Sequence, residues 1–144
     1  MYLMVLSSTE RQDTSPNPIP ASERYLGIYP SLIKSMRRKG QFPKKCDLIF
    51  VTAHGIARAD EKVPLADMPM TRELAISMRE KNLETMKRIL SSKNYDEIYV
   101  NLGQEYLRSI EGFEAYTKST ITYAEGVLGR KAVHMKQWIQ EHPR

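Results

Sequence analysis

Cysteine is almost absent from this chain of 144 residues, which carries only Cys46. A single cysteine excludes an intrachain disulfide framework and a cysteine-rich metal site. We interpret Cys46 as a small core residue beside a strand, in a protein of the reducing cytosol. The three histidines, His54, His134 and His142, lack the spacing of metal ligands, so no metal site is expected.

Long hydrophobic runs and glycine-rich phosphate loops are also missing. No apolar stretch approaches the ~20 residues that cross a bilayer, and the first residues lack the basic and apolar regions of a signal peptide. We therefore expect a cytoplasmic protein with no membrane partner. The glycine fingerprints of dinucleotide and P-loop sites are absent. The residues identify no cofactor and no oligomeric state.

Short apolar runs alternate with helical patterns along the chain. Strands are expected over residues 2–6, 47–51, 97–102 and 119–123, and helices over 21–39, 71–92, 104–110 and 127–141. Gly27 and Pro30 indicate a break in the first helix, and residues 7–20 and 52–70 are expected to be loops. The pattern predicts one α/β domain over residues 1–144, a three-layer sandwich with a mostly parallel central sheet and helices on both faces.

The segment from Ile49 to Asp60 is the best indication of a site. An apolar strand ends in the small-residue turn Thr52-Ala53-His54-Gly55, and a polar segment with Arg58 and Asp60 follows. Ligands of open α/β proteins bind outside the carboxyl ends of strands. His54 is the best candidate for an acid–base group, and Asp60 is a possible orienter of His54 or of Arg58. The alternative is a solvated charged loop.

Three other segments carry candidate residues, and two of them directly follow a predicted strand. We expect Ser7 and Ser8, Arg24 and Tyr25, and Asn101 and Gly103 to join Gly55 and Arg58 at a ligand site. In this interpretation Ser8 and backbone amides hold an anion, Arg24 or Arg58 neutralises it, and Tyr25 or His54 contacts a base or sugar. Ordinary polar turns and half-buried tyrosines remain the alternative.

The net charge of +5 is mildly basic, and its placement is more informative than its sum. A basic cluster lies at the expected end of the first helix and in the loop after it: Lys34, Arg37, Arg38, Lys39, Lys44 and Lys45. Such a positive face is suited to contact a nucleic-acid backbone. The alternative is that cations are favoured at a helix carboxyl end by the helix dipole.

These segments, taken in order, resemble the family of the peroxide-stress protein YaaA and related small uncharacterised domains. The segments are Ser7 to Gln12, Tyr25-Leu26-Gly27-Ile28-Tyr29, Thr52 to Ile56 with Pro64 after them, and Asn101 to Tyr106. The chain departs from the family pattern at Glu10 and Gln12 in place of lysines, at Ser8 in place of cysteine, and at His54 and Leu65 in place of tyrosines. The resemblance implies nucleic acids or nucleotides as ligands, and a role in oxidative stress, without a defined reaction.

We therefore expect a strand-end site for a nucleotide, a nucleobase or a nucleic-acid phosphate. Whether the site performs a reaction is left open by the residues. A non-enzymatic protein that binds nucleic acid through the basic cluster is one alternative. A degenerate family member that serves as a structural or partner subunit is another, and it would expose a large apolar patch.

Overall fold

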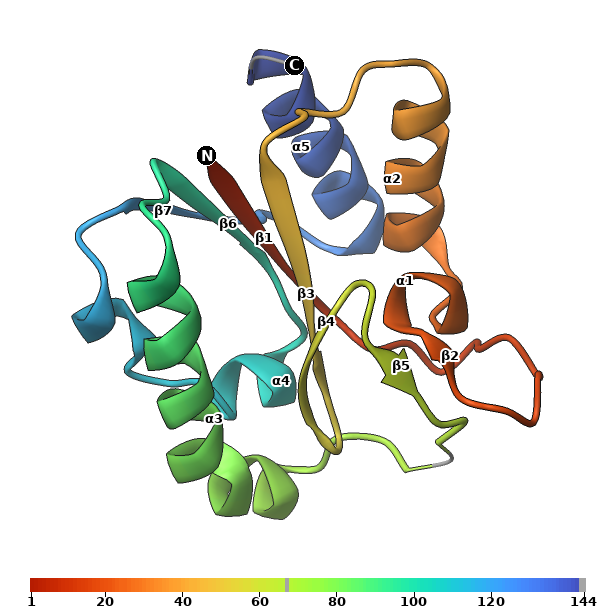
Figure 1. Ribbon diagram of the computed structural model, residues 1–144, viewed down its shortest axis with the longest axis vertical. Coiled ribbons are helices and arrows are strands. Elements are labelled where there is room, and N and C mark those ends of the chain that lie inside the picture. Colours follow the sequence, from red (N-terminus) through yellow and green to blue (C-terminus); the bar gives the residue numbers. More distant parts are fainter. Residues whose placement is uncertain (67, 143–144) are drawn as a thin grey trace.

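The computed structural model describes residues 1–66 and 68–142. Figure 1 shows a central sheet with helices packed around it. The elements are β1 (Tyr2–Ser7), β2 (Ile19–Pro20), α1 (Ala21–Arg24), α2 (Ile28–Arg38), β3 (Cys46–Thr52), β4 (Gly55–Arg58), β5 (Lys62–Val63), α3 (Arg72–Ser92), β6 (Glu97–Asn101), α4 (Gln104–Arg108), the 3₁₀ turn η1 (Phe113–Tyr116), β7 (Thr120–Tyr123) and α5 (Leu128–Glu141).

The five-stranded sheet has the order β4-β3-β1-β6-β7, and β4 alone is antiparallel to its neighbour. The expected α/β class with a mostly parallel sheet is confirmed. Strand β1 lies at the centre, with Tyr2 opposite Cys46 on one side and Glu97 on the other. Its continuous apolar sequence fits this place, because a central parallel strand is buried on both faces.

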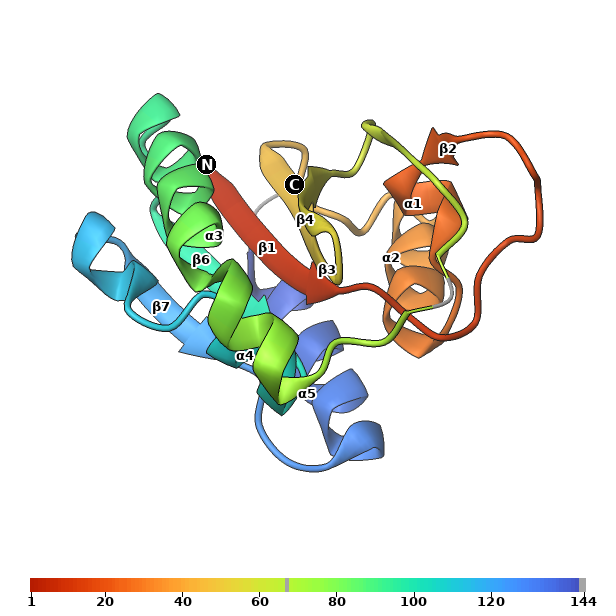
Figure 2. The same cartoon turned by 90° about the horizontal axis from the view of Figure 1, so that it is seen from below.

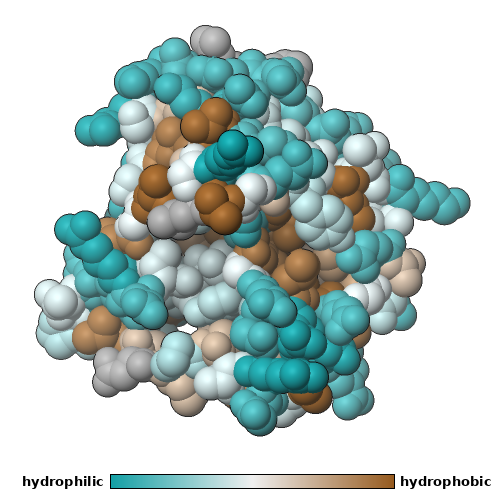
Figure 3. All heavy atoms as spheres, turned by 180° about the vertical axis from the view of Figure 1, so that it is seen from behind, coloured by the Kyte–Doolittle hydropathy of each residue, from teal (hydrophilic) through white to brown (hydrophobic). Residues whose placement is uncertain are grey.

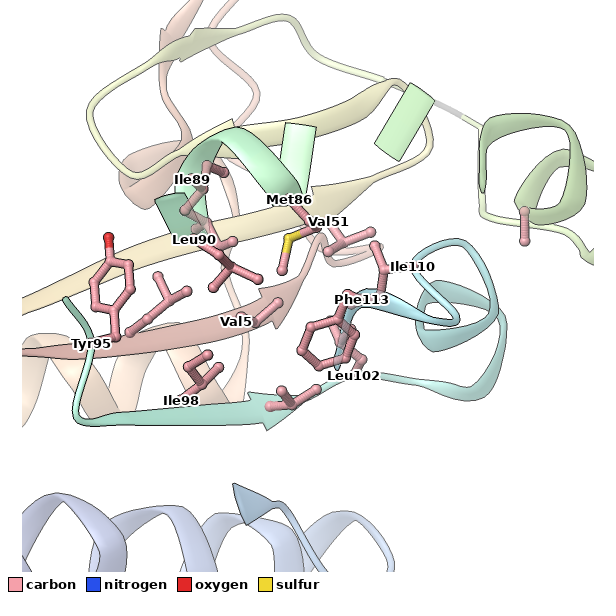
Figure 4. Close-up of a cluster of buried hydrophobic side chains, with 14 of the residues drawn as sticks. Val5, Val51, Met86, Ile89, Leu90, Tyr95, Ile98, Leu102, Ile110 and Phe113 are labelled. Atoms are coloured by element: carbon pink, nitrogen blue, oxygen red, sulfur yellow. The ribbon is translucent and has the colours of Figure 1, made fainter. Parts of the chain in front are cut away.

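Alternate residues of the strands build two apolar clusters on opposite faces of the sheet. Val5, Val51 and Ile98 pack with α3 and with Phe113 of η1 on one face (Figure 4). Met4 and Phe50 point to the other face, where α2 and α5 supply buried residues including Ile33, Met36, Trp138 and Ile139. Figures 1 and 2 show α3 on one side of the sheet and α2 and α5 on the other.

The helix limits follow local chemistry. The Thr71 hydroxyl accepts the Leu74 backbone N–H at 3.2 Å and caps α3, as the sequence predicts. The expected break in the first helix is confirmed, because Gly27 adopts φ +133° between α1 and α2. None of the helices in the described part of the chain is both long and apolar enough to cross a membrane.

The prediction of a continuous loop over residues 52–70 is wrong. Gly55–Arg58 turns back as β4 and pairs with β3 from Thr52 opposite Gly55 to Ile49 opposite Arg58. The apolar content of Gly-Ile-Ala-Arg is too small for a strand signal, and pairing with the buried β3 stabilises the strand. Similarly, β2 in the first long loop pairs with β5. Cys46 lies in β3 and is half-buried.

Candidate binding site at the strand ends

A cavity of about 540 Å³ lies where the chain leaves β1 and β3. We name it the strand-end pocket. The segment after β1, the β3–β4 turn, the segment before α3 and helix α4 contribute its lining: Ser8, Thr9, Glu10, Gln12, Thr14, Tyr25, Thr52, Ala53, His54, Leu65, Ala66, Met68, Pro69 and Tyr106. Strand β1 has neighbours on both sides that are reached by separate connections. This is the kind of place where open α/β sheets bind ligands.

The β3–β4 turn is held by one hydroxyl. Thr52 Oγ1 accepts the His54 backbone N–H at 3.0 Å and donates to the Gly55 carbonyl at 2.8 Å. Gly55 has φ +127°, a conformation that favours glycine. This turn places Thr52, Ala53 and His54 in the pocket wall, with the imidazole exposed at the mouth. Gly55 therefore shapes the turn, and it is not among the residues of the lining.

Two tyrosines bring phenol groups to the pocket. Tyr25 is 3% exposed, packs on Phe50 with ring centroids 5.3 Å apart, and is hydrogen-bonded to the Thr52 side chain. Burial raises the pKa of Tyr25 more than the neighbouring Arg24 charge lowers it, so the phenol keeps its proton at neutral pH. Tyr106 of α4 accepts a hydrogen bond from Ser8 Oγ at 3.4 Å. Tyr106 thus adds a phenol hydroxyl from α4 to the pocket lining.

The opposite wall of the pocket is held by the Gln12 side chain, which bonds to a backbone carbonyl and amide as a neighbouring strand would. Gln12 Nε2 donates to the Ala66 carbonyl at 2.7 Å, and the Ala66 amide donates back to Gln12 Oε1 at 3.3 Å. This pair joins the segment after β1 to the segment before α3. Leu65, Met68 and Pro69 form an apolar part of the lining as a result. The sequence contains no local signal for this wall, because the contact joins residues 54 positions apart.

Charge is scarce in the pocket. Among its described lining residues, Glu10 is the only acidic one and there is no lysine or arginine. The expected anion site therefore has no lysine or arginine in its described lining, and a phosphate placed here would face hydroxyls, a histidine and a carboxylate. Across residues 1–66 and 68–142, no group of three His, Cys, Asp or Glu side chains is placed to hold a metal ion.

The structure places Arg24 away from a ligand. Its side chain is completely buried, and its guanidinium donates to the carbonyls of Asp13, Ser15 and Asn17 at 2.6–2.8 Å. It accordingly positions the loop after β1, and the expectation that it neutralises a bound anion is wrong. Tyr25, its neighbour in sequence, reaches the pocket because the chain becomes extended after α1.

The hairpin carries Arg58 and Asp60 away from the strand ends. Arg58 lies opposite Ile49, and the next amide, that of Ala59, donates to the Leu48 carbonyl. Three strand residues separate Arg58 from the turn, a span of about 10 Å at ~3.3 Å per residue. Asp60 lies farther along and is exposed. The expected pairing of Asp60 with His54 is therefore wrong, and Arg58 lines a different groove.

The third strand end contributes less than expected. Asn101 is 3% exposed, and its amide contacts Met135 Sδ of α5 at 3.7 Å, on the other side of the sheet from α3. Neither Asn101, Gly103 nor Ser7 is among the pocket residues. Tyr106, in the same segment, is the residue that reaches the pocket. Of the predicted site residues, the structure brings Ser8, Tyr25 and His54 together in the pocket lining. The prediction misses Thr52 and Tyr106 as lining residues.

The basic cluster lies at the other end of the sheet from the pocket. Its six residues are all exposed, and none forms an ion pair with a described residue. The guanidinium of Arg37 lies 4.7 Å above the Phe42 ring. Lys45 directly precedes β3, whereas Thr52 ends it, and seven strand residues span roughly 20 Å. A ligand held by this cluster is not in contact with the pocket.

Exposed apolar side chains are spread over several elements. They are Ile28, Leu65, Met68, Ile76, Tyr116, Tyr123, Val127 and Val133. Figure 3 shows that apolar side chains on one face form several groups that hydrophilic side chains interrupt. Leu65 and Met68 border the strand-end pocket.

Comparison with known proteins gives a fold relationship. No protein-family model matches the chain, and no curated protein is significantly similar to it. The crystal structure of AF0587, a protein of unknown function, superposes with a TM-score of 0.56 at 11% sequence identity. The match covers 96% of this chain and 44% of the other, so this chain spans less than half the length of that protein.

Proposed function

We propose that the strand-end pocket binds a neutral, planar, polar ligand of the nucleobase or nucleoside class. The supporting observation is its lining, which combines two phenols and several hydroxyls with an apolar wall and has no lysine or arginine among the described residues. Rings and hydroxyls recognise a planar ligand by packing and hydrogen bonds. A volume of about 540 Å³ is within the usual range for a small-molecule site.

The roles follow from position. The phenol of Tyr25, protonated at neutral pH, and the pair of Ser8 with Tyr106 offer donors and acceptors inside the pocket. His54 at the mouth is placed to contact a ring nitrogen or a sugar hydroxyl. The apolar wall of Leu65 and Met68 is placed to cover one ring face. In this proposal a reaction is not required, and His54 is the group to test first if one is found.

The resemblance to the YaaA family favours the same ligand class and is part of this proposal, as is a role in stress. We also interpret the two helix groups around the sheet as the outer layers of a three-layer sandwich. A cytoplasmic location remains our expectation from composition.

The experiment compares nucleosides with their 5′-monophosphates by calorimetric titration. We expect the nucleoside to bind at least as tightly as the monophosphate, since the added charge meets no lysine or arginine among the described lining residues. Tyr106→Phe removes one hydroxyl and is expected to weaken nucleoside binding by roughly three- to tenfold, the worth of one neutral hydrogen bond. Tyr116→Phe is the matched control, because Tyr116 is a partly exposed tyrosine of η1 outside the pocket.

Three outcomes would contradict the proposal. One is a monophosphate that binds tenfold more tightly than its nucleoside, and another is equal affinity of the Tyr106→Phe variant and the parent. The third is no binding of any nucleoside or free nucleobase.

A second candidate function is contact with a nucleic-acid backbone through the basic cluster. It is supported by the cluster's six exposed cations, none of which forms an ion pair with a described residue. Affinity for single-stranded and duplex DNA and RNA should then fall steeply with salt, with little sequence preference. Reversing two charges, Arg37→Glu with Arg38→Glu, should abolish binding and leave nucleoside binding unchanged. Salt-independent binding, or none, would exclude this function.

A further inference from the structure

Strand β4 leaves an open edge at one side of the sheet. It is the last strand on that side in the described residues. The Ala59 amide donates to the Leu48 carbonyl, so the residues at 55, 57 and 59 bond to β3. By the alternation of an antiparallel ladder, Ile56 and Arg58 direct their backbone amides away from β3. On this outer side the Arg58 carbonyl accepts the Glu61 amide at 3.0 Å, so the edge offers another strand the Ile56 carbonyl and the amides of Ile56 and Arg58.

A groove of about 460 Å³ separates this edge from helix α3. Ile56, Arg58 and Glu61 line it from the hairpin side, and Thr85, Arg88, Ile89 and Ser92 line it from the helix. Ile89 is 5% exposed and Ile56 is half-buried, so the floor is apolar. Figure 4 shows Ile89 and Leu90 on α3 above the strands. The groove thus combines open backbone groups with an apolar floor.

The charges around this groove favour an acidic occupant. Arg58 and Arg88 come from opposite walls, both are exposed, and neither forms an ion pair with a described residue. Glu61 is the acidic side chain of the lining. Asp47 feels the charge of Arg58, but its carboxylate is already bonded to Lys93 and Tyr95. Two guanidinium groups therefore remain for carboxylates, which they bind as forked donors.

We propose that this groove binds an extended acidic peptide, which adds a strand to β4. The backbone of the peptide pairs with the amides of Ile56 and Arg58, and its carboxylate side chains pair with Arg58 and Arg88. Apolar side chains of the peptide cover Ile56 and Ile89. A peptide is favoured over a nucleic acid because the open groups are strand amides, which pair with the carbonyls of another strand. This site is separate from the strand-end pocket.

The test uses a capped peptide of alternating valine and aspartate, titrated into the isotope-labelled protein and followed by NMR. We expect amide shifts to concentrate at Ile56, Arg58 and the facing turns of α3. Arg58→Ala and Arg88→Ala should each weaken binding by about fivefold, the upper range for an exposed ion pair. Arg72→Ala is the matched control, an exposed arginine of α3 outside the groove, and should leave peptide binding unchanged. N-methylation of the central peptide amides should abolish binding, because it blocks strand pairing.

Several results would overturn the proposal. The first is the absence of shifts at millimolar peptide. Shifts that lie outside the groove, or that persist with the N-methylated peptide, would exclude strand addition. Equal binding of a valine–lysine peptide would exclude the acidic preference. An oligonucleotide that binds the groove in place of the peptide, or a dimer that forms through β4 and excludes it, would assign the edge to another occupant.

Discussion

The buried guanidinium of Arg24 provides the sharpest test of how this fold builds its pocket. Its Nη1 donates to the carbonyls of Asp13 and Ser15 at 2.7 and 2.8 Å, and its Nη2 donates to Asn17 at 2.6 Å. A weaker bond of 3.4 Å reaches Val63, beside the far wall. The loop after β1 is therefore wrapped around one cation. We predict that Arg24→Met detaches this loop and removes the wall that contains Gln12.

The magnitude follows from two opposing terms. A hydrogen bond from a charged donor contributes roughly 1.5–3 kcal/mol, so the three short bonds together contribute about 4–9 kcal/mol. The guanidinium has no carboxylate partner among the described residues, and taking it out of water costs several kcal/mol, which methionine avoids. We expect a net loss of about 2–4 kcal/mol in the free energy of unfolding. Detachment of the loop limits the loss, because the remaining core can stay folded.

Urea unfolding followed by circular dichroism measures the global loss, and hydrogen exchange locates it. The amide of Asp13 donates to the Arg24 carbonyl, and that of Leu26 donates to the Arg11 carbonyl. Both should lose protection in Arg24→Met, whereas amides of β1 and β6 should change only with global stability. Arg24→Lys should give an intermediate loss, since one ammonium cannot serve both Nη positions. Arg38→Met, an exposed arginine of α2, is the control.

A change below about 0.5 kcal/mol with unaltered exchange at Asp13 and Leu26 would refute this reasoning. It would mean that desolvation of the guanidinium cancels its hydrogen bonds. A gain in stability would refute it more strongly. An equal loss in Arg38→Met would show that the measurement reports charge and not these contacts.

Three further predictions concern single residues. Burial alone would raise the pKa of Asp47, but hydrogen bonds from Tyr95 and Lys93 lower it below its usual value. Asp47→Asn should therefore lower the free energy of unfolding by about 1 kcal/mol near neutral pH. The difference in stability between the variant and the parent should vanish as pH falls through that lowered pKa. Burial raises the pKa of the Cys46 thiol to about 12, so iodoacetamide at mildly alkaline pH should alkylate it at least about a hundredfold more slowly than free cysteine, with the normal rate in urea. Gly55→Ala should lower the free energy of unfolding, measured in urea, by about 1–3 kcal/mol because φ is +127° at this position, although the added Cβ meets open space. Gly103→Ala is the control, because φ is −66° there.

The strands and most helix limits of this protein are readable from short-range patterns. The apolar run of β1, the Thr71 cap and the Gly27 break each depend on neighbouring residues, and the structure has all three. Strand β4 is different, because its four residues gain their pairing from β3. Because the prediction treated β4 as part of a loop, it placed Arg58 and Asp60 near the strand ends. The returning strand leads the chain away from them.

The candidate site divides in the same way. Ser8 directly follows β1 and His54 lies in the short turn after β3, and the sequence therefore predicts where they lie. Tyr106 enters from α4 and accepts a hydrogen bond from Ser8, and Met68 enters because Gln12 binds the Ala66 backbone. Arg24 has the residue type of an anion ligand, but its surroundings turn it inward to carbonyl groups. A charged side chain acquires its role from its partners, and distant parts of the chain supply them.

The sequence by itself determined an α/β domain, the order of its main strands and helices, and the end of the sheet at which hydroxyl and imidazole groups gather. Periodic burial and helix capping act within one or two turns, and they suffice for that much. Tertiary structure decided that no lysine or arginine is among the described lining residues of the pocket at this end. Of the two cations predicted for this site, Arg24 is buried against loop carbonyls and Arg58 lies farther along the hairpin. The basic cluster, predicted as a separate face, is exposed at the opposite end of the sheet. Which charges face a cavity depends on long-range pairing, and that is the physical reason why composition and spacing could not reveal it.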